Sequence, residues 1–122
     1  MNTRKVVSGS LPDEFYRRLV ELSNQGFWVI DLLGQTVFAN AQMGAMLGYT
    51  SAEMIGRSFL DFMSPEAREL AQKYLVRRQN GIYEKHDFCF QHKSGTDVWA
   101  IVDSAEFIDS GRTLLLASVT DI

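Results

Sequence analysis

Strand-forming residues occupy two separate blocks of this 122-residue chain, with helical patterns between them. The first block, residues 27–39, is rich in aromatic and β-branched side chains and carries a turn at residues 32–35, which predicts a hairpin. The second block predicts three strands, over residues 83–92, 97–107 and 113–119. Because a two-stranded hairpin is not stable alone, the two blocks are expected to join into one five-stranded antiparallel sheet.

The segment between the two blocks opens with patterns typical of short helices. Asn40 can cap a helix that ends at Gly48, because its side chain can accept hydrogen bonds from free backbone N–H groups. Thr50 and Glu53 have the spacing of a capping box, which predicts a one-turn helix. Another short turn is expected over residues 59–63.

One longer helix is expected to follow. Ser64-Pro65-Glu66 combines a cap, a proline at the first helical position and an acid in the first turn, and the helix is expected to end near Gln79. Arg77 and Arg78 lie near the negative end of its dipole, and together with Lys73 they are interpreted as a solvated face. With the helices packed on one face of the sheet, the predicted fold class is α+β.

The residues before the first strand divide into two parts. Residues 1–10 have little hydrophobic pattern and are interpreted as a linker or a cloning remnant. Residues 11–25 predict an amphipathic flanking helix, because apolar residues such as Phe15 and Leu19 recur near helical spacing. Residues 26–122 are predicted to form the main domain.

Composition narrows the functional classes. The chain is 46% hydrophobic and 22% charged with a net charge of -3, an ordinary mixture for a soluble domain with no basic cluster that would indicate nucleic acid binding. No apolar run reaches the roughly 20 residues of a membrane span, so no membrane partner is expected for this segment. The lone Cys89 favours a reducing cytoplasm, although a parent protein could be anchored in a membrane elsewhere.

The order of these elements and the residues at their joints resemble the PAS family, also called the sensory-box or S-box family, over residues 14–122. The motifs that carry the resemblance are Asp31-Leu32-Leu33-Gly34, Val37-Phe38-Ala39-Asn40, Leu47-Gly48-Tyr49-Thr50, Glu53-Met54-Ile55-Gly56, Pro65-Glu66, and Lys93-Ser94-Gly95-Thr96 before Trp99. Asp121-Ile122 resembles the start of a truncated Asp-Ile-Thr motif, which joins many PAS domains to an effector. The resemblance therefore implies an input domain from a bacterial multidomain signalling protein.

The resemblance also implies a cofactor-binding or ligand-binding pocket between the inner sheet face and the helices. Its candidate residues are Trp28, Ile30, Met43, Met46, Phe59, Met63, Leu70, Tyr74, Phe88, Phe90, Ala100 and Val119. This set is apolar, so it predicts either a pocket for a small apolar ligand or simply a filled core. No metal site is expected, because His86, Cys89 and His92 lie too far apart along one strand to surround one ion.

The residues of this chain argue against two cofactor classes of the family. Flavin-binding light-oxygen-voltage members carry a reactive cysteine at the place where this chain has Phe59, which argues against a photoreactive flavin. Haem-binding members ligate iron with a histidine on the longer helix, and residues 64–79 contain none. The identity of any cofactor stays unknown at this stage.

A non-catalytic input role is the expected function. The sequence has no Ser/His/Asp set, no phosphate-cradling glycine loop and no paired-carboxylate signature. The resemblance implies that a small-ligand or redox signal passes through Asp121 and Ile122 to an effector in the same chain, first of all a sensor histidine kinase of a two-component system. The alternative is the PAS domain of a diguanylate cyclase (GGDEF) or transcriptional regulator, acting mainly as a dimerisation module without ligand.

A homodimer is also expected. Val29, Trp99 and Ile101 would lie on the outer face of the sheet, and an apolar face of this kind needs cover. The flanking helix is expected to fold over this face, to pair with its copy in a second chain, or to do some of each.

Overall fold

The computed structural model describes residues 13–122, so the predicted linker at residues 1–10 and the first two residues of the flanking helix lie outside the described residues. The elements in chain order are α1 (Asp13–Leu22), β1 (Gly26–Asp31), β2 (Thr36–Ala39), α2 (Ala41–Leu47), α3 (Ser51–Met54), the 3-10 helix η1 (Phe59–Phe62), α4 (Pro65–Gln79), β3 (His86–Gln91), β4 (Asp97–Asp109) and β5 (Arg112–Asp121). This order confirms the predicted α+β class.

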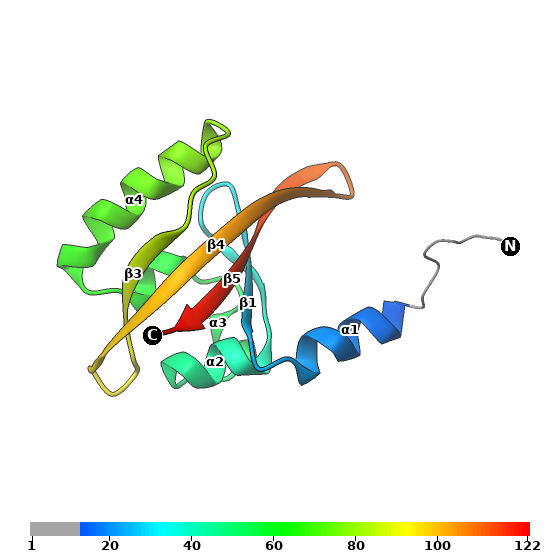
Figure 1. Ribbon diagram of the computed structural model, residues 1–122, viewed down its shortest axis with the longest axis horizontal. Helices are drawn as coiled ribbons and strands as arrows, with labels where there is room; N and C mark the ends of the chain where they lie inside the picture. The colour runs from blue at the N-terminus through cyan, green and yellow to red at the C-terminus, as the bar shows by residue number, and fades with distance from the viewer. Residues whose placement is uncertain (1–12) are drawn as a thin grey trace, which may run out of the picture.

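The five strands form one antiparallel sheet in the order β2-β1-β5-β4-β3, as expected (Figure 1). The β1–β2 hairpin joins the second block through β5, which pairs with β1 on one side and β4 on the other. The last strand in sequence is therefore the central strand of the sheet. The register places Trp28 opposite Ala117 and Ile30 opposite Leu115, so these four side chains share one face.

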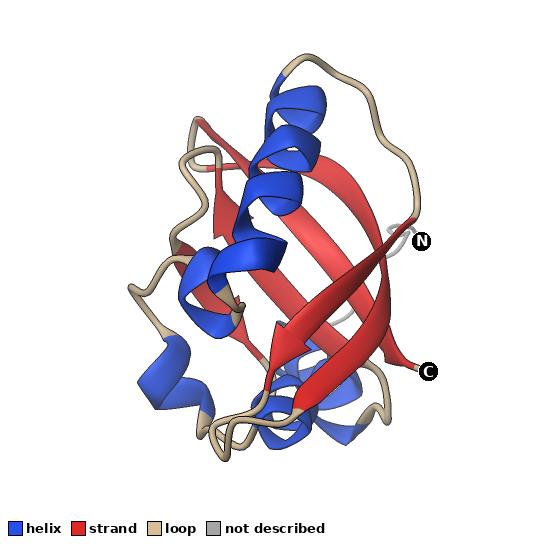
Figure 2. Cartoon of the chain, turned by 90° about the vertical axis from the view of Figure 1, so that its left-hand side faces the viewer, coloured by secondary structure: helices blue, strands red, loops and turns tan. Residues whose placement is uncertain are grey.

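The helices α2 to α4 cover that face of the sheet (Figure 2). Their starts follow the predicted caps: Asn40, Thr50 and Ser64 each accept a backbone N–H of the first helical turn. Between sheet and helices lies one core, which includes Trp28, Ala39, Met43, Leu47, Met54, Phe59, Phe62, Met63, Ala71, Leu75, Phe88, Phe90, Ala100, Val102, Leu115 and Val119. Within residues 13–122, no helix is long and apolar enough to cross a membrane.

Asn40 ties three elements together at one end of the sheet. Its side chain is fully buried, and its carbonyl oxygen accepts the backbone N–H groups of Phe27 and Met43, each at 3.0 Å. Its amide group donates to the backbone oxygens of Val20 and Gln25, at 2.9 and 3.0 Å. The predicted helix cap therefore also anchors the end of α1 to the domain, with all its polar atoms paired.

The first strand of the second block is shorter than predicted. β3 begins at His86, whereas the sequence pattern predicted a strand from Tyr83. The Glu84 carboxylate accepts a hydrogen bond from Arg77 Nη2 at 2.6 Å, and the Tyr83 hydroxyl donates to Glu106 at 2.8 Å. These side-chain contacts hold the segment against α4 and the β4–β5 hairpin in place of a strand ladder.

The flanking helix does not cover the outer face of the sheet within the single chain. α1 contains no buried residue and extends away from the sheet (Figure 1). Trp99 is 53% exposed and Leu19 is 54% exposed. Val29, expected on the same outer face, is buried beside its strand neighbours Phe38 and Leu116. The expectation that α1 folds over Trp99 in its own chain is therefore wrong, and the outer face stays largely open.

Candidate ligand-binding site

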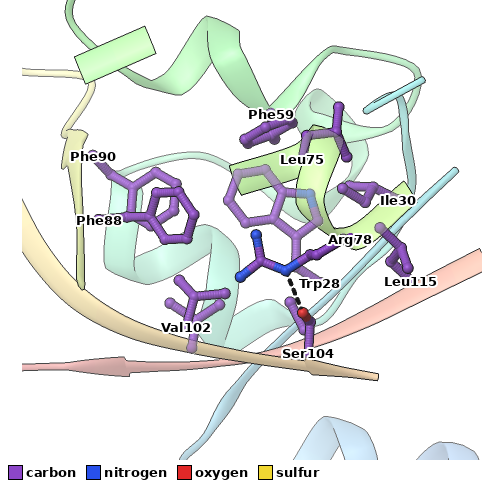
Figure 3. Close-up of a pocket in the computed structure, with 12 residues that line it drawn as sticks. Trp28, Ile30, Phe59, Leu75, Arg78, Phe88, Phe90, Val102, Ser104 and Leu115 are labelled. Carbon is purple, nitrogen blue, oxygen red and sulfur yellow. Dashed lines mark hydrogen bonds between the residues drawn. The ribbon is translucent and has the colours of Figure 1, made fainter. Parts of the chain in front are cut away.

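A cavity of about 40 Å³ lies between α4 and the inner face of the sheet (Figure 3). Its lining residues are Trp28, Ile30, Phe59, Leu75, Arg78, Phe88, Phe90, Val102, Ser104, Leu115, Ala117 and Val119. All but two of these side chains are apolar. The exceptions are Arg78 from α4 and Ser104 from β4, which lie next to each other.

The Trp28 indole forms one wall of the cavity and is held in place from several sides. Its N–H donates to Thr36 Oγ1 at 2.9 Å, and both residues are buried. Its ring meets Phe62 edge-on with centroids 5.5 Å apart, and the ring of Phe90 also lies 5.5 Å away. A buried indole with its N–H satisfied and aromatic neighbours is a rigid wall.

Arg78 is buried, with only 6% of its surface exposed, so the prediction of a solvated face is wrong for this residue. Ala71, Leu75 and Arg78 follow the i, i+4, i+7 spacing of one helix face, and that face packs on the sheet. Arg77, one residue earlier, is rotated by about 100° and stays exposed, as predicted. Helical phase therefore separates two adjacent arginines into a surface residue and a cavity residue.

The Arg78 guanidinium has polar contacts but no ion pair. Nε donates to Ser104 Oγ at 2.6 Å, and Nη2 lies 3.4 Å from His86 Nδ1 and 3.5 Å from the Glu84 backbone oxygen. The cation also lies 5.6 Å from the centre of the Phe88 ring. No carboxylate within residues 13–122 forms a salt bridge with it, because the Glu84 carboxylate pairs with Arg77 instead. Burial lowers the pKa of Arg78 below its ordinary value, with the charge of Glu84 opposing that shift most.

His86 lies beside Arg78 as a neutral ring. Arginine has no acceptor, so the contact with Nδ1 requires that Nδ1 accepts and that Nε2 carries the proton. The ring stacks on Tyr74 with centroids 3.5 Å apart. Burial, and then the charge of Arg78, lower the pKa of His86. His86 does not line the cavity, and Arg78 is the only charged side chain among the residues that do.

The apolar cavity under a five-stranded sheet matches the expected architecture, and comparison with protein families decides the assignment. A family model described as the PAS fold matches residues 14–122. The chain belongs to the PAS family. PAS domains are non-catalytic sensory modules.

Several solved PAS structures resemble this PAS domain. The PAS domain of an HTR-like protein from Haloarcula marismortui is 26% identical, with a TM-score of 0.75 over 90% of this chain and 93% of that chain. A PAS domain from a two-component sensor histidine kinase is 14% identical, with a TM-score of 0.76 over 89% and 95%. The PAS domain of the Cronobacter turicensis quorum-sensing receptor RpfR, in complex with BDSF, is 21% identical, with a TM-score of 0.71 over 84% and 98%. A sequence search against curated proteins finds no match.

The predicted pocket residues of this PAS domain fall into three groups. Six line the cavity, namely Trp28, Ile30, Phe59, Phe88, Phe90 and Val119. Met43, Met63 and Ala100 are buried elsewhere in the same core, and Met46 and Tyr74 pack against it. Leu70 is 50% exposed, so its placement facing the sheet is wrong. It precedes Ala71 by one position and is turned away from the face that carries Ala71 and Leu75.

Six cavity residues are not among the predicted pocket residues: Leu75, Arg78, Val102, Ser104, Leu115 and Ala117. The signal for Ser104 was strand alternation, because it has the same parity as Ala100 and Val102 on β4. The signal for Leu75 and Arg78 was their helical spacing from Ala71. Ser104 therefore follows the alternation of β4, whereas the inward position of Arg78 depends on which face of α4 packs on the sheet.

Proposed function

We propose that this PAS domain is a non-catalytic sensory input that binds a small ligand in the cavity under α4 and passes the signal to an effector. The observation that carries the proposal is the cavity itself: eleven uncharged residues and one buried arginine between the sheet and the helices η1 and α4. An apolar site with a few convergent polar groups is the usual form of a small-molecule site. The RpfR neighbour holds BDSF and, in a second structure, C12:0, which supports ligand binding by a domain of this fold.

The proposed relay route is the central strand. Ala117 and Val119 of β5 line the cavity, and the same strand ends at Asp121, two residues later. The backbone N–H of Ile122 donates to the Trp99 backbone oxygen at 3.1 Å, and Asp121 pairs with Ala100, so both residues are bound to the first part of β4. A ligand that shifts β5 or β4 would move these two residues, by a change in the population of two states.

The proposed effector is a sensor histidine kinase, and the similarity to a PAS domain from a two-component sensor histidine kinase supports this choice. The second candidate is a dimerisation module of a diguanylate cyclase or transcriptional regulator. The open outer face of the sheet supports this second candidate, because Trp99, Phe107 and Leu116 are all exposed there. We also propose that a second copy of the chain covers this face together with the apolar side of α1, where Phe15, Leu19 and Leu22 are exposed.

The proposed ligand is neither a photoreactive flavin nor a haem ligated by a helix residue. Phe59 stands in the place of the reactive cysteine of the flavin class, and α4 carries no histidine. An absorption spectrum of the purified protein tests this directly. A flavin or haem band would contradict it.

Ligand binding is tested by a fragment screen that follows the Trp28 indole N–H by NMR, with native mass spectrometry of the purified chain. Ala117→Phe fills the cavity and is expected to abolish binding, whereas Ala105→Phe on the exposed face of β4 is expected to preserve it. Hits that survive Ala117→Phe, or a screen with no hit that shifts Trp28, would leave the dimerisation module as the better proposal.

A further inference from the structure

Arg78 places an unpaired positive charge in an otherwise apolar cavity. Buried charges in proteins are nearly always paired, because removing an ion from water costs several kcal/mol that only a partner offsets. No salt bridge to Arg78 occurs within residues 13–122. Asp103, the next residue to Ser104 on β4, points to the opposite face of the sheet by strand alternation. The cation therefore has no counter-ion among residues 13–122.

The hydrogen-bonding capacity of Arg78 is also incomplete. A guanidinium has five N–H donors, and its acceptors in the described residues are Ser104 Oγ, His86 Nδ1 and the Glu84 backbone oxygen. Both N–H groups of Nη1 are left without an acceptor there. Figure 3 shows the guanidinium among the apolar side chains that line the cavity, between Phe88 and Trp28. Arg78 lines the cavity, so a ligand there would meet the side chain that carries the free donors.

The surroundings specify the charge and shape of the missing partner. His86 is neutral, so the cavity carries a single positive charge, which one negative charge balances. A dianion would leave a buried negative charge unpaired. One carboxylate oxygen can accept a charge-assisted hydrogen bond from Nη1. The Ser104 oxygen accepts from Arg78 Nε, so its O–H is available to donate to the other carboxylate oxygen.

We propose that the ligand of this cavity is a monocarboxylate with an apolar tail, its carboxylate bound by Arg78 and Ser104 and its tail lying against Trp28 and Phe88. This inference rests on the proposed ligand-binding function and adds the chemical class of the ligand. The cavity of about 40 Å³ holds about three water-sized groups. The carboxylate alone takes up that space, and the tail must displace Leu75 and α4 from the sheet.

The competing interpretation is structural: Arg78 would only link α4 to β4 through Ser104. The two interpretations differ in what happens when an uncharged analogue is offered. A carboxylate site must prefer an acid over the alcohol of the same chain length, whereas an apolar cavity with a structural arginine must prefer the alcohol, which is cheaper to remove from water.

The experiment titrates the full chain with butyrate, hexanoate and octanoate and with butan-1-ol, hexan-1-ol and octan-1-ol, following the Trp28 indole N–H by NMR. At least one acid is expected to bind roughly tenfold tighter than its alcohol, and Arg78→Met is expected to weaken acid binding roughly ten- to a hundredfold. Arg78→Lys is expected to recover part of the loss. Arg77→Met, the matched change on the exposed side of the same turn, is expected to leave the affinities unchanged.

Equal or tighter binding of the alcohols by the unchanged chain would overturn the carboxylate assignment and leave ligand binding in place. Acid binding that survives Arg78→Met would also overturn it. If neither series binds, the assignment is overturned as well, and the fragment screen with Ala117→Phe decides separately whether the cavity binds any ligand. The acid-to-alcohol comparison needs no variant, so it stands even if Arg78→Met fails to fold.

Discussion

The indole N–H of Trp28 and the hydroxyl of Thr36 form a 2.9 Å hydrogen bond in which each residue is only 3% exposed. Thr36 belongs to β2, one of the two edge strands, and does not line the cavity, whereas Trp28 forms its wall. The edge hairpin therefore fixes the orientation of a side chain at the centre of the site. Thr36 acts as a positioning residue for the cavity.

Thr36→Val is expected to lower the free energy of unfolding by about 1–3 kcal/mol, because it keeps the shape of the side chain and leaves the buried indole N–H without an acceptor. Urea denaturation measures the change. Thr113→Val on β5 serves as the matched control, since no hydrogen bond of its side chain occurs in the described residues, and it is expected to change stability by much less. Equal effects of the two substitutions would show that the Trp28 contact contributes little.

Arg78→Met is expected to leave the ligand-free stability unchanged or to raise it by up to about 2 kcal/mol, because it replaces an unpaired buried cation with an apolar side chain of similar length. Leu75→Ala, on the same face of α4, is expected to lower stability by about 2–5 kcal/mol. Thermal and urea unfolding compare the two variants. A loss for Arg78→Met as large as that for Leu75→Ala would mean that Arg78 is a structural residue.

Stability is expected to fall as the pH drops below about 6.5, the ordinary pKa of a histidine. The pKa of His86 is lowered in the folded chain, first by burial and then by Arg78, so the unfolded chain binds a proton that the folded chain excludes. Stability therefore rises with pH between the pKa of His86 in the folded chain and 6.5. This contribution is lost as the pH falls through that range. Glu84, which lies 3.8 Å from Nε2, opposes the shift.

His86→Gln removes this titration while keeping an acceptor for Arg78. Its unfolding free energy, measured by urea denaturation from pH 7.5 to 5.5, is expected to depend less on pH than that of the unchanged chain. His92→Gln, one residue after the end of β3, is the control and is expected to keep the slope. A slope unaffected by His86→Gln would assign the pH dependence to other groups.

Trp99→Gln is expected to shift a dimer towards monomer, since Trp99 is the most exposed aromatic residue on the outer sheet face. Light scattering over a wide concentration range measures the oligomeric state. Leu33→Gln changes an equally apolar, 79% exposed residue in a turn and is expected to have no effect. A chain that stays monomeric at all concentrations would rule out the dimer.

Local signals explain why much of the fold was predictable. Asn40, Thr50 and Ser64 specify helix starts through their own side-chain hydrogen bonds, which depend only on residues three positions away. The loop conformation of Tyr83 and Glu84 was harder to predict, because side chains of two other elements, α4 and β4, hold them outside the strand. Such contacts leave no periodic pattern in the sequence.

The inward position of Arg78 was not predicted for a different reason. Apolar residues occur on both sides of α4, and two of them, Leu70 and Val76, are about half exposed. The helix therefore has no clear apolar stripe that would indicate which face is inside, and an arginine at its last turn has the usual composition of a solvated end. Only packing against β4 identifies Arg78 as the inward residue.

The central position of β5 has a consequence for how the chain folds during synthesis. β5 pairs with β1 on one side and with β4 on the other. The β1–β2 hairpin and the strands β3 and β4 therefore have no strand pairing between them until residues 112–121 are available. Pairing β1 with β5 closes a loop that contains nearly the whole domain, which makes the step slow. On the ribosome, the domain is thus expected to stay unfolded until its last strand has left the exit tunnel, when any following segment is already being made.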